Sequence, residues 1–159
     1  GTTIRVSHQL GKGDLPAVRM ASNASIHLVV LINTFAAALM IGLRHYIPLL
    51  FTEDAEVIAI ASQLLIFAGL YQYSDGLQAV GAAMLRGITD VKVPMVIAFV
   101  SYIIVGMSVG LVCTFPLGMG AAGIWVGFIV GLTFAAVLFH TRFNKKYRQM
   151  RGKVADVRK

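Results

Sequence analysis

The chain has 159 residues, of which 57% are hydrophobic and 13% are charged, and its mean hydropathy is +0.77. A soluble domain averages about 25% charged residues, so this composition excludes an ordinary soluble domain and predicts an all-α, multi-pass membrane protein. The formal net charge of +7 would suggest nucleic acid as the partner of a soluble protein. In a membrane protein it indicates basic loops beside the bilayer, and we expect no nucleic-acid partner.

The first segment, residues 1–12, is predicted to be the last part of a helix that begins upstream, so we expect the chain to be the C-terminal part of a longer protein. Residues 11–14 contain two glycines and break this helix. Asp14 is suited to cap the next helix, and Pro16 fits its first turn. A short amphipathic helix is therefore expected from Leu15 along the membrane surface, leading into the next span.

The first complete span is predicted over residues 24–43, which carry no Lys, Arg, Asp or Glu and have the length of about 20 residues that crosses a bilayer. Asn33, near its middle, is a candidate for a substrate path or a cation ligand, although such side chains more often form hydrogen bonds between helices. Thr52 is predicted to cap the following helix. The acids after it, Glu53 and Asp54, are interpreted as a solvated helix start and not as a metal site.

The second span, about residues 57–85, contains a single carboxylate, Asp75. A charged side chain at the centre of a bilayer costs about 2.5–3.5 kcal/mol or more, and such residues usually face the interior of a bundle and handle ions or protons. Tyr71, Asp75 and Gln78 recur at i, i+4 and i+7, so they share one helix face. We therefore predict that Asp75 binds a coupling cation or proton, with Tyr71 and Gln78 as further ligands. The alternative is that a protonated Asp75 only joins two helices by a hydrogen bond.

The third and fourth spans are predicted over residues 94–115 and 121–139. The third contains Gly106 and Gly110, and the fourth repeats glycine at every fourth residue, which predicts a smooth face for close helix packing. This repeat comprises Gly123, Gly127 and Gly131. Trp125, near the start of the fourth span, is expected to anchor the helix at the membrane interface. Residues 144–159 are predicted to be a basic tail that attracts anionic lipid head groups.

The distribution of basic residues predicts the orientation. With four alternating spans, 13 of the 14 lysines and arginines lie on one side of the membrane, and the exception is Arg44. This side should be cytoplasmic, because cytoplasmic loops carry an excess of lysine and arginine. The tail is then cytoplasmic, and the acidic loop that contains Glu53 faces outward.

Four stretches carry a resemblance to a known family. They are Gly1-Thr2-Thr3-Ile4-Arg5-Val6 with Leu10-Gly11-x-Gly13, Tyr71-Gln72-x-Ser74-Asp75-x-x-Gln78, Leu85-Arg86-Gly87-x-x-Asp90, and Gly120-Ala121-Ala122-Gly123-Ile124-Trp125-x-Gly127. Together they resemble the C-terminal lobe of the multidrug and toxic compound extrusion (MATE) family, in its bacterial NorM-type branch. The likeness extends to about residue 143. The chain departs from the family pattern in the third span, where Ile103 replaces a frequent tryptophan and Met107-Ser108 replaces a frequent Leu-Pro.

The resemblance implies a twelve-span transporter in two lobes, of which residues 1–143 supply the end of span eight and spans nine to twelve. It implies export of cationic and aromatic drugs across the bacterial inner membrane in exchange for sodium ions or protons, with no other cofactor. It places Asp75 in the cation site of the tenth span. The remaining partners implied are the lipid bilayer and the N-terminal lobe of the same protein.

Two other classes of function are weighed against transport. A non-transporting membrane subunit would use the glycine faces and Asp75 for assembly with partners, and the length of the native reading frame distinguishes it from a transporter. A membrane-embedded enzyme ranks last, because the sequence shows no paired intramembrane acids, no nucleophile with a base and no metal motif. Among transporters, a flippase for lipid or polysaccharide precursors should have a more basic cavity.

Overall fold

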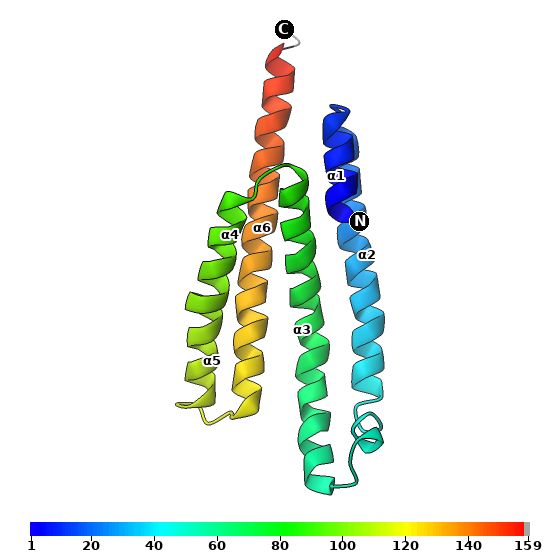
Figure 1. Ribbon diagram of the computed structural model, residues 1–159, viewed down its shortest axis with the longest axis vertical. Coiled ribbons are helices and arrows are strands. Elements are labelled where there is room, and N and C mark those ends of the chain that lie inside the picture. Colours follow the sequence, from blue (N-terminus) through cyan, green and yellow to red (C-terminus); the bar gives the residue numbers. More distant parts are fainter. Residues whose placement is uncertain (158–159) are drawn as a thin grey trace.

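A computed structural model of the chain describes residues 1–157, with side chains as far as Val154, and this part is built from helices and short connections (Figure 1). The helices are α1 (Thr2–Gly11), α2 (Leu15–Gly42), a 3-10 turn η1 (Pro48–Leu50), α3 (Ala55–Gly87), α4 (Lys92–Phe99), a π-helical stretch η2 (Val100–Gly106), α5 (Met107–Thr114) and α6 (Ala121–Val157). Four segments are long and apolar enough to cross a membrane: α2, α3, α4–η2–α5 and α6. The predicted all-α membrane fold is confirmed.

The four long segments stand side by side, in an order that differs from their order in the chain (Figure 1). Helix α6 lies between α3 and the α4–η2–α5 segment, and α2 packs on the other side of α3. Helix α1 packs against α2 and α3, at the end of the molecule where α6 projects beyond the other helices. Because α6 separates α3 from α4–η2–α5, one face of α3 is left uncovered within this chain.

The start of α2 confirms one prediction and corrects another. The Asp14 carboxylate accepts a hydrogen bond of 2.9 Å from the backbone N–H of Ala17, and Pro16 lies in the first turn, as expected for an N-cap. No separate surface helix precedes the span, because α2 runs without interruption from Leu15 to Gly42. After Pro16 this stretch contains neither proline nor glycine before Gly42, so nothing in it breaks the helix.

The predicted cap at Thr52 is wrong. Helix α3 begins at Ala55, and its N-cap is Asp54, whose carboxylate accepts the N–H groups of Glu56 at 2.9 Å and Val57 at 3.4 Å. Thr52 lies two residues too early, and its hydroxyl oxygen accepts the N–H of Asp54 at 3.1 Å instead. A carboxylate at the positive end of the helix also stabilises the helix dipole, which favours aspartate at this position.

The last two spans contain features that the sequence analysis did not predict. The third span is not a uniform α-helix, because residues Val100–Gly106 are π-helical. The region predicted as a tail from residue 144 is a continuation of α6, which remains helical to Val157. Arg158 and Lys159 of that tail lie outside the described residues.

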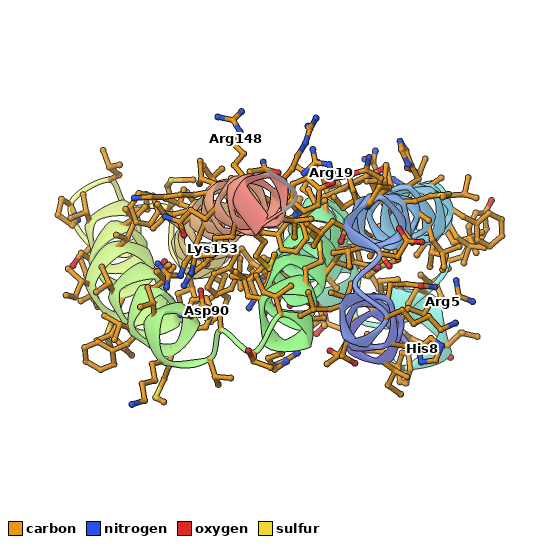
Figure 2. All side chains as sticks on the ribbon, turned by 90° about the horizontal axis from the view of Figure 1, so that it is seen from above. Arg5, His8, Arg19, Asp90, Arg148 and Lys153 are labelled. Atoms are coloured by element: carbon orange, nitrogen blue, oxygen red, sulfur yellow. The ribbon has the colours of Figure 1, made fainter. Side chains whose placement is uncertain are left out.

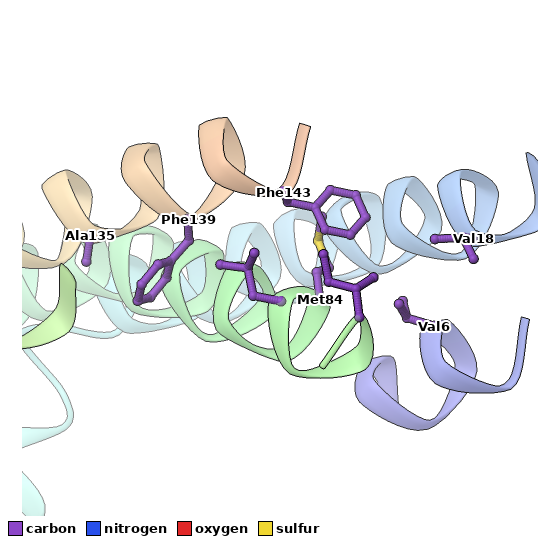
Figure 3. Close-up of a cluster of buried hydrophobic side chains, with 8 residues drawn as sticks. Val6, Val18, Met84, Ala135, Phe139 and Phe143 are labelled. Carbon is purple, nitrogen blue, oxygen red and sulfur yellow. The ribbon is translucent and has the colours of Figure 1, made fainter. Parts of the chain in front are cut away.

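The buried core lies at the end of the molecule where α1, α2, α3 and α6 meet (Figure 3). Its buried members are Val6, Val18, Met84, Leu85, Ile88, Ala135, Phe139 and Phe143. Elsewhere the spans are largely uncovered, since only 6% to 33% of the most apolar stretch of each span is buried. The rest of this apolar surface must face lipid or further protein.

Candidate functional site

The contact between α5 and α6 confirms the predicted packing of glycines. A Cβ atom on Gly127 would lie 2.6 Å from both the carbonyl oxygen of Gly106 and the Cα of Gly110. A Cβ atom on Gly131 would lie 2.9 Å from the carbonyl oxygen of Ser101. The two backbones therefore meet directly, as small residues permit in membrane helices.

Beside this contact lies an apolar groove of about 670 Å³ between the third and fourth spans, which reaches Tyr71 of α3. Its lining includes the glycines of η2, α5 and α6 that make this contact, together with aliphatic and aromatic side chains. The aromatic residues are Tyr71, Tyr102, Phe115 and Phe128. Its size is in the range of pockets that hold drug-sized molecules.

Tyr71 forms the aromatic end of this groove. Its ring meets Trp125 edge to face at 5.6 Å between centroids, and Phe128 at 6.4 Å. Trp125 and Phe128 also contact each other edge to face at 6.5 Å. Trp125, expected only as an interface anchor, is thus part of an aromatic cluster that connects α3 with α6.

Asp75 lies one helical turn from Tyr71 on the same face of α3, and it is exposed within this chain. Gln78 and Tyr71 on either side of it are half-buried. The face that they share borders α6, where Tyr71 meets Trp125 and Phe128, and Tyr102 of η2 lies beside its Gln78 side chain. The structure therefore brings Tyr71, Asp75 and Gln78 together, as the helical spacing predicted. Among these three residues, Tyr71 lines the groove, and the Asp75 carboxylate is exposed within this chain one helical turn away.

The depth of Asp75 in the membrane follows from its neighbours. The Asn33 amide, at the middle of the apolar part of α2, donates a hydrogen bond of 2.6 Å to the Gln72 carbonyl oxygen. It also fills the space beside Gly76, where any Cβ would overlap it. Asp75 thus lies level with the middle of the neighbouring span. The structure places Asn33 in the contact between α2 and α3, and its role in a substrate path stays a prediction.

Other polar residues near Asp75 pair with neighbouring helices. The Ser74 hydroxyl forms a hydrogen bond of 2.8 Å with the Thr133 hydroxyl of α6, and Tyr73 donates one of 3.0 Å to Thr34 of α2. Among the described side chains, the carboxylate that forms an ion pair is that of Asp90, whose partner is Arg142 at 2.6 Å. Asp75 thus differs from the polar residues around it, which serve packing.

The groups around Asp75 can bind a hard cation or a proton. A carboxylate, an amide oxygen and a phenol oxygen are the donors that such ions prefer. Within the described residues, no three His, Cys, Asp or Glu side chains come together, so the donor set is not that of a transition-metal site. Tyr102 was missed as a neighbour of this group, because its distance from Asp75 in sequence carries no periodic signal.

Comparison with known proteins identifies the family. The family model described as MatE matches residues 1–112. The chain belongs to the MatE family. This confirms the resemblance found in the sequence.

Curated relatives share about two fifths of their aligned residues with this chain. A probable multidrug resistance protein NorM from Xanthomonas axonopodis pv. citri (strain 306) is 40% identical over 153 residues, which cover 96% of this chain and 33% of that protein. Multidrug resistance protein MdtK from Pectobacterium atrosepticum is 40% identical over 157 residues, covering 96% of this chain and 34% of that protein. The chain thus spans about a third of the length of the curated relatives that it matches.

Solved structures agree on the fold. The eukaryotic MATE transporter AtDTX14 superposes with a TM-score of 0.81 at 23% identity, over 96% of this chain and 35% of that one. The inward-facing conformation of a multidrug resistance MATE family transporter of the MOP superfamily gives a TM-score of 0.85 at 14% identity, over 95% of this chain and 35% of that one. The arrangement of helices described above is therefore shared with about a third of each of these two chains.

Proposed function

We propose that this chain forms part of a secondary antiporter that exports lipophilic organic cations in exchange for sodium ions or protons, and that Asp75 accepts the coupling ion. The observation that carries the proposal is the position of Asp75. It is a carboxylate at mid-membrane depth, exposed beside an apolar aromatic groove and flanked by Tyr71 and Gln78.

The cost of the carboxylate supports an ionic role. Placing an acid at the middle of a span costs about 2.5–3.5 kcal/mol or more. Ser74, Tyr73 and Asn33 already provide hydrogen bonds from this region to neighbouring helices. An additional acid is therefore not needed to join α3 to α2 or α6, whereas binding of a cation or a proton requires one.

The groove supports the class of substrate. Its lining is almost entirely apolar and includes tyrosine and phenylalanine rings, and one of them, Tyr71, lies one helical turn from the acid. Aromatic faces attract organic cations, and apolar walls favour flat lipophilic groups. The relatives named above are described as multidrug resistance proteins, which agrees with a broad apolar groove. Alternating access would come from movement of this lobe against the N-terminal lobe.

The placement of basic residues supports the orientation. Arg5, Arg19, Arg148 and Lys153 lie around the ends of α1, α2 and α6, at one end of the molecule (Figure 2). We propose that this end is cytoplasmic and that the protein resides in the bacterial inner membrane, because basic residues are retained on the cytoplasmic side. The lipid bilayer and the N-terminal lobe would then cover the exposed apolar faces.

The test uses the complete native reading frame that includes this chain, expressed in cells at matched levels. Efflux of ethidium is followed by fluorescence, with and without added sodium and at several pH values, for wild type and Asp75→Asn. Glu53→Gln is the matched control, since it removes an exposed acid at the start of α3. We expect Asp75→Asn to abolish efflux or its dependence on the ion, and Glu53→Gln to behave as wild type.

Unchanged efflux and ion response in Asp75→Asn would refute the role of this acid. If, in addition, the complete protein exported no organic cation, a non-transporting membrane subunit would be the better description. In that case Asp75 and the glycine faces would serve assembly with partners.

A further inference from the structure

The π-helical stretch η2 is a deviation from regular structure in the middle of the third span. It covers the seven residues Val100–Gly106 and is flanked by regular helix on both sides. Single π-helical segments within α-helices are rare and occur frequently at functional sites. Its second residue is Ser101, which is buried and donates a hydrogen bond of 2.6 Å to the Ile97 carbonyl oxygen.

One side of this stretch packs against α6. The Ser101 carbonyl and the Gly106 backbone approach Gly131, whose missing side chain leaves room for them. This contact explains why the backbone can come so close to α6. It does not explain the direction of Tyr102, which lies on the groove and not in the glycine contact.

Tyr102, from η2, lies close to the Asp75 group on α3. It lines the groove together with Tyr71, lies beside Gln78, and is within electrostatic range of Asp75. A change of backbone register by one residue rotates the following side chains of a helix by about 100°. Tyr102 lies within the π-helical stretch itself, so its direction is set where the helix departs from regular α-geometry. Helix α3 contributes Tyr71, Asp75 and Gln78. The third span adds one further oxygen donor, Tyr102.

We propose that Tyr102 belongs to the ion site at Asp75 and that its hydroxyl oxygen binds the coupling ion from the side of η2. The inference rests on the proposed function of Asp75. A carboxylate and its neighbours on one helix reach an ion from one side only. Hard cations prefer six or more oxygen ligands from several directions. An oxygen on η2 supplies a second direction, and its binding draws η2 toward α3.

The experiment compares Tyr102→Phe with wild type in the complete protein. This variant keeps the ring in the groove and removes only the hydroxyl. We expect the concentration of the coupling ion at half-maximal ethidium efflux to rise by about three- to tenfold, as for the loss of one neutral oxygen partner. At a saturating ion concentration, efflux should stay within about twofold of wild type. Tyr73→Phe is the matched control, because its hydroxyl contacts Thr34 on the other side of α3.

A second readout does not depend on transport. The thermal unfolding temperature of the purified protein is measured against sodium chloride, with potassium chloride at equal ionic strength, and against pH. Whichever ion raises the unfolding temperature of wild type should do so at higher concentration in Tyr102→Phe. The expected shift matches that seen in efflux.

The outcomes separate the two proposals. If Asp75→Asn loses its ion response and Tyr102→Phe keeps the wild-type midpoint in both readouts, Tyr102 is only a wall of the groove and this inference is refuted. If Asp75→Asn responds to the ion as wild type does, the proposed function fails and the inference about Tyr102 fails with it. An equal shift of the ion midpoint in Tyr73→Phe and Tyr102→Phe would also refute the inference. The effect would then follow from loss of any tyrosine hydroxyl near Asp75.

Discussion

The end of the molecule formed by α1, α2, α3 and α6 is packed like the interior of a soluble protein, whereas the groove beside α3 is open. At the packed end, Phe139 and Phe143 are almost fully buried, and Arg142 pairs with Asp90. Beside the groove, Asp75 is exposed, and the groove itself is lined by apolar and aromatic side chains. The two regions share α3 and α6, so the same helices provide both rigidity and a site.

This difference separates stability from function. Close packing leaves little freedom for a side chain to move, and removal of a packed atom lowers the free energy of unfolding. An open groove loses little stability when a lining side chain changes, but it presents that side chain to a ligand. Substitutions at the packed end should therefore lower stability, and substitutions at the groove should alter transport.

The largest effect on stability is expected for Phe143→Ala. Phe143 is fully buried against Val6, Val18 and Met84, and its ring stacks on Tyr147 at 6.4 Å (Figure 3). Its removal should reduce the free energy of unfolding by about 3–5 kcal/mol, through lost burial and a cavity. Denaturant titration of the purified protein measures this. Efflux per folded molecule should remain unchanged, and a selective loss of efflux would show that the packed end takes part in transport.

Gly127→Ala tests a close backbone contact within the groove, where packing and substrate space meet. Its new methyl group would meet the backbone of Gly106 and Gly110, which cannot rotate away. We expect a loss of about 1–3 kcal/mol from overpacking. Because Gly127 also lines the groove, the efflux of ethidium should fall as well. Gly42→Ala is the control, since a Cβ there meets open space. Normal stability in Gly127→Ala would mean that α5 and α6 move apart more easily than the structure indicates.

The Arg142–Asp90 ion pair should contribute about 1–2 kcal/mol, because the two side chains are only 24% and 11% exposed. Arg142→Gln and Asp90→Asn should each lower the unfolding temperature, and the double variant should lose less than the sum of the two. The interaction energy comes from this double-mutant cycle. Additive losses would indicate that the pair is screened and that the α3–α4 connection is held by apolar contacts alone.

Asn33→Ala should have the smallest effect. It removes one hydrogen bond from α2 to the Gln72 carbonyl, which in membrane helices contributes about 0.6 kcal/mol on average. The unfolding temperature should fall slightly, and ethidium efflux and its ion dependence should not change. A marked change in substrate preference would instead support the predicted role of Asn33 in a substrate path.

Much of the fold could be predicted from hydropathy and from the local chemistry of helix starts. The four apolar stretches were found because a span must consist of apolar residues over its whole length, which any window along the sequence detects. The grouping of Tyr71, Asp75 and Gln78 followed from helical spacing, and the cap at Asp14 from the chemistry of helix starts. The cap at Thr52 failed because several adjacent residues can cap a helix, and only the start of the helix decides among them.

Sequence alone thus determined that this protein crosses the membrane, where its helices lie, and which residues share a face, since all three depend on neighbours within a few turns. Only the tertiary structure decided that α6 lies between α3 and the third span, leaving Asp75 exposed beside a groove. It also decided that Tyr102 lies beside Gln78 and that Asn33 faces Gln72. These contacts join residues far apart in the chain. They depend on how close two backbones can approach, and here glycines at the helix contacts set that distance.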